Sequence, residues 1–172
     1  MIVLITGGSG SGKSTYAERL MDRTAGGKRY YIATMRVHDA ESEVRVSRHR
    51  AQRAGKGYET LECPLDLSAA KVAARASVLL ECLPNLVANE MFDGGDVSRV
   101  FPALSALANR CKHLLIVTND VFSDSERYTP EVRAYMQSLA QLNIRTAALA
   151  DSVVEVVYSI PLALKGAAPC EL

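Results

Sequence analysis

The feature that most limits how this chain can fold is a glycine-rich run at positions 7–14, GGSGSGKS. The run fits the pattern G-x-x-x-x-G-K-[ST] at every defined position. The apolar segment 2–6 precedes it, and an amphipathic segment beginning near Lys13 follows it. A strand that leads through a glycine turn into a helix is the context in which this pattern cradles phosphate. The sequence therefore predicts an α/β fold of the P-loop NTPase type.

Each part of this glycine-rich loop has an expected task in holding a nucleoside triphosphate. Glycines let backbone N–H groups converge on phosphate oxygens, and the N-terminus of the following helix adds a partial positive charge. Lys13 is expected to reach the β- and γ-phosphates, and the Ser14 hydroxyl is expected to ligate Mg²⁺. The residues assigned to the nucleotide are Gly7, Gly8, Ser9, Gly10, Ser11, Gly12, Lys13 and Ser14. A chance Gly/Ser turn is the alternative.

Apolar runs alternate with helical patterns along the rest of the chain, and this alternation predicts a mostly parallel sheet covered on both faces. Residues 163–172 are expected to form a tail, clear of the fold from about position 166, and 1–172 to form one domain. Further strands are expected at 29–34, 77–81, 113–119 and 153–160. Helices are expected at about 39–53, capped by Asp39, and after Thr129-Pro130, with Val132, Tyr135, Met136, Leu139 and Leu142 on one stripe.

Composition excludes several classes of protein. The 172 residues are 48% hydrophobic and 23% charged, and the net charge is +1, so no global field favours nucleic acid or an anionic membrane. No apolar run reaches the ~18–20 residues that span a bilayer. The first residues carry no basic segment typical of a secretory signal, so a cytoplasmic location is expected. The four cysteines form no C-x-x-C pair, which disfavours a zinc site.

A P-loop protein also needs an acidic group for the metal, usually at the end of a second buried strand. Glu81 ends the predicted strand 77–81 and is the first candidate. Asp120 follows the predicted strand 113–119 and is the second candidate. A carboxylate that only caps a loop is the alternative at both positions.

An arginine-rich segment surrounds one histidine, His49. A solvated basic helix is one explanation, and RNA binding is disfavoured because no aromatic residues alternate with the arginines. A neutral imidazole that attacks phosphorus, with guanidinium groups holding the phosphates, is the chemical alternative. His38 is expected in a surface loop and His113 at the start of a strand. The arginines are Arg36, Arg45, Arg48, Arg50 and Arg53.

Further segments, in their order and spacing, carry a family resemblance. With the glycine-rich loop they resemble the bifunctional adenosylcobinamide kinase / adenosylcobinamide-phosphate guanylyltransferase family. The most specific part is an I-A-T segment followed by R-[IV]-x-x-H-R. The segments are Tyr31-Ile32-Ala33-Thr34, Asp39-x-Glu41, Arg45-Val46-x-x-His49-Arg50-x-x-Arg53, Thr60-Leu61-Glu62, Leu79-Leu80-Glu81-Cys82-Leu83 with Asn89, and Val117-Thr118-Asn119-Asp120-Val121.

The resemblance implies a trimeric P-loop enzyme that phosphorylates a hydroxyl of adenosylcobinamide, a corrinoid. It then implies transfer of GMP from GTP onto adenosylcobinamide phosphate through GMP carried on a histidine, which is His49 here. ATP and GTP are the implied nucleotide substrates, with Mg²⁺ held by Ser14 and Glu81. The residues implied beside the nucleotide or its metal are Ala33, Thr34, Met35, Arg50, Ala51, Gln52, Arg53, Glu62 and Glu81.

The segment after the fourth predicted strand departs from the family pattern. Members usually carry a glycine-rich loop there, whereas residues 119–130 contain no glycine. Two alternatives therefore stay open beside the bifunctional enzyme. One is a P-loop small-molecule kinase or NTPase without guanylyl transfer, and the other is a non-catalytic nucleotide-binding protein.

Overall fold

The structure, a computed structural model, describes residues 1–24, 27–37, 43–44, 46–47, 50–51, 55–120 and 128–167. Among these residues, seven strands form one sheet in the order β3-β2-β4-β5-β1-β6-β7. Neighbouring strands are parallel except for β6 and β7, which are antiparallel. The strands are β1 (Ile2–Thr6), β2 (Arg29–Ala33), β3 (Tyr58–Glu62), β4 (Ser77–Glu81), β5 (His113–Val117), β6 (Ser152–Val157) and β7 (Ile160–Lys165).

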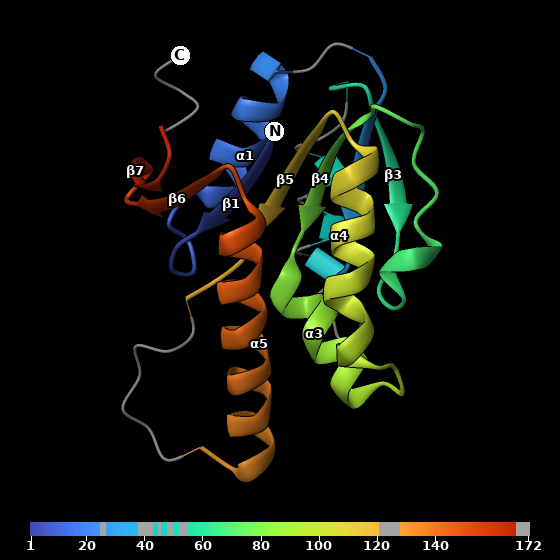
Figure 1. Cartoon of the computed structure of the whole chain (residues 1–172), viewed down its shortest axis with the longest axis vertical. Coiled ribbons are helices and arrows are strands. Elements are labelled where there is room, and N and C mark those ends of the chain that lie inside the picture. The colour runs from blue at the N-terminus through green and yellow to red at the C-terminus, as the bar shows by residue number, and fades with distance from the viewer. Residues whose placement is uncertain are drawn as a thin grey trace.

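Helices cover both faces of this sheet, so the predicted three-layer α/β arrangement is confirmed (Figure 1). One helix, α1, packs against β1, β4, β5 and β6, while α3, α4 and α5 lie over the opposite face. Residues 43–44, 46–47 and 50–51 are also helical. The helices are α1 (Lys13–Thr24), α3 (Leu83–Phe92), α4 (Val100–Arg110) and α5 (Pro130–Leu149), with short 3-10 turns at Leu67–Ala69 and Val97–Arg99.

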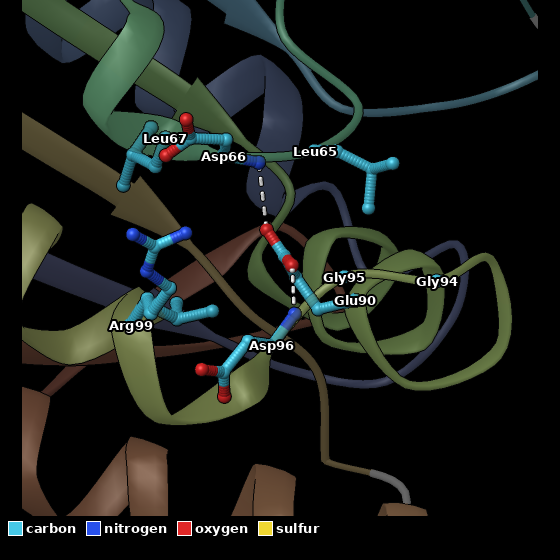
Figure 2. Close-up of a pocket in the computed structure, with 9 residues that line it drawn as sticks. Leu65, Asp66, Leu67, Glu90, Gly94, Gly95, Asp96 and Arg99 are labelled. Carbon is cyan, nitrogen blue, oxygen red and sulfur yellow. Dashed lines mark hydrogen bonds between the residues drawn. The ribbon is translucent and has the colours of Figure 1, made fainter.

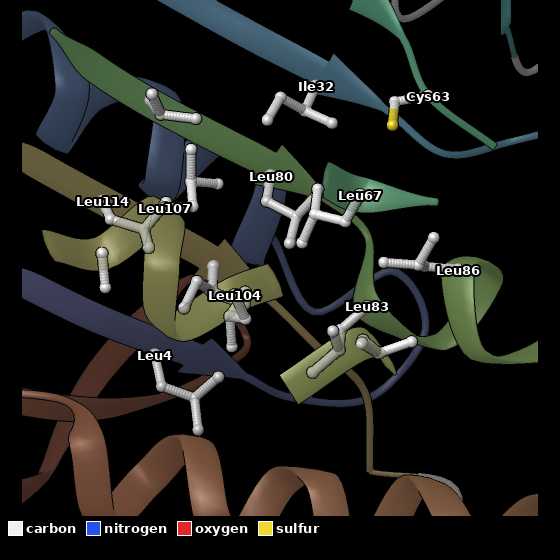
Figure 3. Close-up of a cluster of buried hydrophobic side chains, with 14 of the residues drawn as sticks. Leu4, Ile32, Cys63, Leu67, Leu80, Leu83, Leu86, Leu104, Leu107 and Leu114 are labelled. Atoms are coloured by element: carbon white, nitrogen blue, oxygen red, sulfur yellow. The ribbon is translucent and has the colours of Figure 1, made fainter. Parts of the chain in front are cut away.

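Alternate residues of the central strands enter two separate hydrophobic cores. In β4, Val78 and Leu80 join the larger cluster beneath α3, α4 and α5, whereas Leu79 joins the smaller cluster beneath α1. Figure 3 shows the larger cluster, where Leu80 lies near Leu67. Because side chains alternate along a strand, burial on both faces requires an unbroken apolar run. This is why the central strands could be recognised in the sequence.

The end of the chain differs from the prediction of a single strand at 153–160 followed by a tail. The chain turns back at Tyr158 and Ser159, so Ile160–Lys165 forms the antiparallel edge strand β7. The Lys165 ammonium donates to the carbonyls of Ala147, Ala148 and Ala150, 2.7–3.0 Å away, where α5 ends. Cations are favourable at a helix C-terminus, so this contact helps to hold β7 against the fold.

The other strand predictions agree closely with the structure. The strands at 2–6 and 77–81 are confirmed, while β2 and β5 end one and two residues earlier than predicted. His113 begins β5 as expected. The predicted Asp39 cap and His38 lie outside the described residues.

The helix after Thr129 is confirmed, and the Thr129 hydroxyl accepts from the Val132 N–H at 3.4 Å. Leu139 and Leu142 are buried, whereas Val132 is exposed because the first turns of α5 extend past the sheet (Figure 1). No helix in the described part of the chain is long and apolar enough to cross a bilayer.

Candidate active site

The glycine-rich loop connects β1 to α1 at the edge where the parallel strands end. Gly7, Gly10 and Gly12 have φ values of 147°, 72° and 93°, which side-chain-bearing residues rarely adopt. A Cβ on Gly12 would lie 2.5 Å from the Ser159 hydroxyl, and a Cβ on Gly7 would collide with the Val156 carbonyl. Glycine is therefore required at both positions, by backbone conformation and by the close approach of the β6–β7 hairpin.

Lys13 begins α1, and its side chain folds back over the glycine-rich loop. Its ammonium group donates to the carbonyl oxygen of Gly8 at 3.0 Å. Burial lowers the pKa of Lys13, and the nearby Glu81 carboxylate partly opposes that shift. A partly desolvated cation held within the loop is suited to an anionic ligand, because phosphate oxygens would replace its lost hydration.

Glu81 ends β4, and the structure brings its carboxylate to the start of α1. The Ser14 hydroxyl donates to Glu81 Oε1, and the Tyr31 hydroxyl donates to Glu81 Oε2 at 3.1 Å. The other candidate, Asp120, is an exposed residue beyond the end of β5. Of the two predicted carboxylates, the structure therefore places Glu81 in contact with Ser14.

The end of β2 is fixed to the segment that follows β4. The Thr34 hydroxyl donates to the Cys82 carbonyl and accepts from the Cys82 N–H, both at 2.8 Å. The Asn89 amide donates to the carbonyls of Thr34 and Pro64, at 2.8 and 2.9 Å. Burial also raises the pKa of Cys82 to about 12, so this cysteine stays a neutral thiol. Thr34 and Asn89 thus hold the backbone beside Glu81 in place.

Part of the arginine-rich segment reaches the end of β3. The Arg50 guanidinium and the Glu62 carboxylate form an ion pair at 3.0 Å. Ala33 ends β2 and pairs in register with both Glu62 and Glu81. Met35 follows at the same sheet edge, and Ala51 is exposed in the helical segment beside Arg50. The remaining predicted residues, His49, Gln52 and Arg53, lie outside the described residues.

Tyr31 and Ser159 are site residues to which sequence analysis gave no role. Tyr31 belongs to the quoted Tyr31-Ile32-Ala33-Thr34 segment, but its contact with Glu81 depends on β2 and β4 being neighbours. Ser159 donates its backbone N–H to the carbonyl of Ser11 at 2.8 Å. No sequence pattern predicts that the β6–β7 hairpin contacts the glycine-rich loop.

A cavity of about 290 Å³ lies between the segment after β3 and the segment after α3 (Figure 2). The buried Glu90 carboxylate crosses this region and accepts from the backbone N–H groups of Asp66 and Asp96, both at 2.7 Å. No predicted site residue lines the cavity. Its lining residues are Leu65, Asp66, Leu67, Glu90, Gly94, Gly95, Asp96, Arg99 and Val100.

Within the described part of the chain, no group of three or more His, Cys, Asp or Glu residues could hold a metal ion. The oxygen pair of Ser14 and Glu81 is a different kind of site. Hydroxyl and carboxylate oxygens suit a hard cation that completes its coordination with phosphate and water.

The mostly parallel sheet, with a glycine-rich loop leading from β1 into α1, defines an α/β protein with a P-loop NTPase-like fold. The profile of the family described as cobinamide kinase / cobinamide phosphate guanyltransferase matches residues 3–164. The chain belongs to this family.

Individual relatives agree with this assignment. The bifunctional adenosylcobalamin biosynthesis protein CobU of Salmonella typhimurium is 32% identical over 184 residues, covering 96% of this chain and 100% of the relative. The protein of the same name from Escherichia coli K12 shows the same identity and coverage. The bifunctional adenosylcobalamin biosynthesis protein CobP of Pseudomonas aeruginosa is 30% identical, covering 95% of this chain and 96% of the relative.

Proposed function

We propose that this protein phosphorylates adenosylcobinamide and then transfers GMP from GTP onto adenosylcobinamide phosphate, giving adenosylcobinamide-GDP. The observation that carries the proposal is the hydrogen bond between Ser14 and Glu81 beside the buried ammonium of Lys13. A hydroxyl, a carboxylate and a cation at one glycine-rich loop are the groups that phosphoryl transfer from a triphosphate requires. The family and the names of the relatives add the corrinoid substrate and guanylyl transfer.

The kinase step needs positioning rather than a protein nucleophile. Backbone N–H groups of the loop and Lys13 hold the β- and γ-phosphates of ATP or GTP. The substrate hydroxyl then attacks the γ-phosphorus in line, its oxygen bonds to that phosphorus, and the bond to the β-phosphate oxygen breaks. The nucleoside diphosphate leaves, and the hydroxyl proton passes to a base or to water. In this scheme Lys13 neutralises charge that develops on the leaving oxygens.

Ser14 and Glu81 are the residues that would hold Mg²⁺. Both present oxygen atoms, which this cation prefers, at the mouth of the loop. The bound cation would neutralise phosphate charge during transfer. Tyr31 bonds the second oxygen of Glu81 and so orients the carboxylate towards Ser14.

Guanylyl transfer would use His49 as the nucleophile. Its neutral imidazole attacks the α-phosphorus of GTP, pyrophosphate leaves, and the phosphate of the phosphorylated substrate then takes the GMP. Arg50, the next residue along the chain, is tied to Glu62 where β3 ends. That ion pair supports a place for the arginine-rich segment at the sheet edge that carries the glycine-rich loop.

Incubation with α-labelled GTP tests the proposal. Wild-type protein is expected to acquire an acid-labile label that adenosylcobinamide phosphate removes, and His49→Ala is expected to lose the label while retaining kinase turnover. His113→Ala is the matched control, because His113 starts β5 and is expected to keep the label. Kinase turnover without any label in wild-type protein would favour a P-loop small-molecule kinase. A label that survives His49→Ala would assign the nucleophile elsewhere.

The proposal includes a homotrimer, as the family resemblance implies, and a cytoplasmic location. The edge strand β7 supports self-association, because Ile160, Leu162 and Leu164 occupy alternate positions and are all exposed. Such an apolar row is typical of a surface that another chain covers. Light scattering on the wild-type protein measures the oligomeric state directly.

A further inference from the structure

The tip of the β6–β7 hairpin forms one wall of the glycine-rich loop. The backbone N–H of Ser159 donates to the Ser11 carbonyl at 2.8 Å, and Gly12 approaches Ser159 so closely that no Cβ would fit. At the other end of the loop, Gly7 packs against the backbone carbonyl of Val156. The hairpin and the loop therefore hold each other in place. A side chain at the tip of the hairpin lies beside the ligand that the loop would bind.

The tip has an unusual sequence for its conformation. Tyr158 and Ser159 both have positive φ values, 50° and 65°. A two-residue hairpin turn with this conformation favours Asn and Gly, which adopt positive φ at little cost. Tyr158 is also 90% exposed, so packing within the chain does not compensate for the strain. A strained, exposed aromatic residue next to a binding loop points to a role in binding.

The two sides of the glycine-rich loop offer different chemistry. On the β4 side are Glu81, Ser14 and the hydroxyl of Tyr31. The ends of β2 and β3 lie further along that side, and β2 is separated from β6 by β4, β5 and β1, about 19 Å at the usual strand spacing. On the β6 side the structure places the exposed ring of Tyr158. Phosphates and a cation suit the first side, and a purine base suits the second.

We propose that the ring of Tyr158 packs against the purine base of the nucleoside triphosphate held by the glycine-rich loop. The inference rests on the proposed function in that it takes the loop to bind a triphosphate. It adds a base-binding residue on the side of the loop opposite to Glu81. Stacking on an aromatic ring tolerates any base, so the contact suits whichever purine triphosphate the loop holds for the kinase step.

Equilibrium binding of two probes tests the proposal: a non-hydrolysable ATP analogue, which has a base, and inorganic tripolyphosphate, which has none. Tyr158→Asn removes the ring and supplies a residue suited to the turn. It is expected to raise the Kd of the ATP analogue about tenfold and to leave that of tripolyphosphate within about twofold. Tyr158→Phe, which keeps the ring, is expected to bind both probes like wild type.

Phe92→Ala is the matched control, since it removes another exposed aromatic residue, on α3, and is expected to change neither Kd. An unchanged Kd of the ATP analogue in Tyr158→Asn would overturn the proposal. Equal weakening of both probes would also overturn it, because the hairpin would then only support the loop. Either result leaves the proposed function standing, whereas a wild-type protein that binds neither probe would refute both.

Discussion

Two glutamates on opposite ends of the same short segment are held in different ways. The Glu81 carboxylate, at the end of β4, accepts from two side-chain hydroxyls, those of Ser14 and Tyr31. The Glu90 carboxylate, near the end of α3, accepts from two backbone N–H groups, those of Asp66 and Asp96. Both glutamates are thus fully engaged, but only the partners of Glu81 can turn away by rotating a side chain.

This difference indicates that the site around Glu81 binds a ligand, whereas the site around Glu90 stabilises the fold. Hydroxyl groups can rotate and can donate to one partner while accepting from another, so Glu81 can exchange Ser14 for a shared cation. Backbone N–H groups have no such freedom, and an N–H that loses its buried acceptor stays unsatisfied. We therefore expect Glu81 to govern activity and Glu90 to govern stability. Substitutions at the two sites test this division.

The largest effect is expected at Lys13, the cation beside Glu81. Lys13→Met removes the ammonium group but keeps an unbranched side chain of similar length. Kinase turnover is expected to fall about 10²–10³-fold, the usual loss when one preorganised charge donor is removed from a transition state. Steady-state kinetics with adenosylcobinamide measures it. Near-wild-type kinetics would show that the glycine-rich loop is not the catalytic site.

Lys13→Met is also expected to change how the stability of the protein depends on pH. Burial holds the folded-state pKa of Lys13 below its ordinary value of 10.5, so at neutral pH the charged form disfavours folding. Without nucleotide, Lys13→Met is expected to melt no lower than wild type. Between the lowered pKa and 10.5 the unfolded chain binds more protons, so wild type gains stability relative to the variant as pH rises. A gap that widens in favour of the variant with rising pH would contradict this account.

The next effect is expected at Glu81. Glu81→Gln keeps the shape of the side chain but removes the charge that a metal requires, and kinase turnover is expected to fall about 10–100-fold. The free energy of unfolding without nucleotide is expected to stay within about 1 kcal/mol of wild type, because an amide can still bond hydroxyl groups. Turnover at several Mg²⁺ concentrations, together with urea unfolding, separates the two quantities.

At Glu90 we expect the opposite of the result at Glu81: a loss of stability with little loss of turnover. Glu90→Gln places an amide N–H₂ where a carboxylate oxygen accepts from a backbone N–H, so one buried charge-assisted hydrogen bond is lost. The expected cost is about 2 kcal/mol of unfolding free energy. Turnover per folded molecule is expected to match wild type at a temperature well below the melting transition. A large loss of turnover in the folded variant would contradict this account and place Glu90 in the active site.

The smallest effect is expected at Gly95, which lies against Glu90. A Cβ added there would lie 2.9 Å from the Cα of Glu90 and would also collide with its carboxylate. Gly95→Ala is therefore expected to destabilise the protein by about 1 kcal/mol through overpacking, with turnover unchanged. Gly94→Ala tests a different cause at the neighbouring position. Gly94 has open space but a positive φ of 84°, so strain alone should destabilise that variant.

Continuous apolar runs made the central strands predictable. The edge strand β3 and the turn between β6 and β7 were not predictable in this way. Strand β3 has the sequence YETLE and lies at the sheet edge, where polar residues face solvent, so its pattern carries no burial signal. The turn between β6 and β7 was missed because Tyr158 and Ser159 stand where Gly or Asn would have marked it. Helices α3 and α4 were not predicted at all.

The candidate active site also contains contacts that the sequence predicted and contacts that it did not. Ser14 and Glu81 were predicted to meet because a motif fixes the first and the end of a buried strand fixes the second. The contact of Tyr31 with Glu81 required knowing that β2 lies beside β4, and strand order is not encoded in hydrophobic pattern. The roles proposed for His49, Gln52 and Arg53 stay predictions.

The position of β1 between β5 and β6 has a consequence for how the chain folds during synthesis. Leu4 of β1 pairs with Ile116 on one side and with Val153 on the other. The strand that leads into the glycine-rich loop is therefore made early but completes its pairing only after most of the chain has left the ribosome. Contacts of such long sequence separation form slowly. Until β5 and β6 have been made, the apolar residues of β1 are unpaired, and unpaired apolar strands are prone to aggregate.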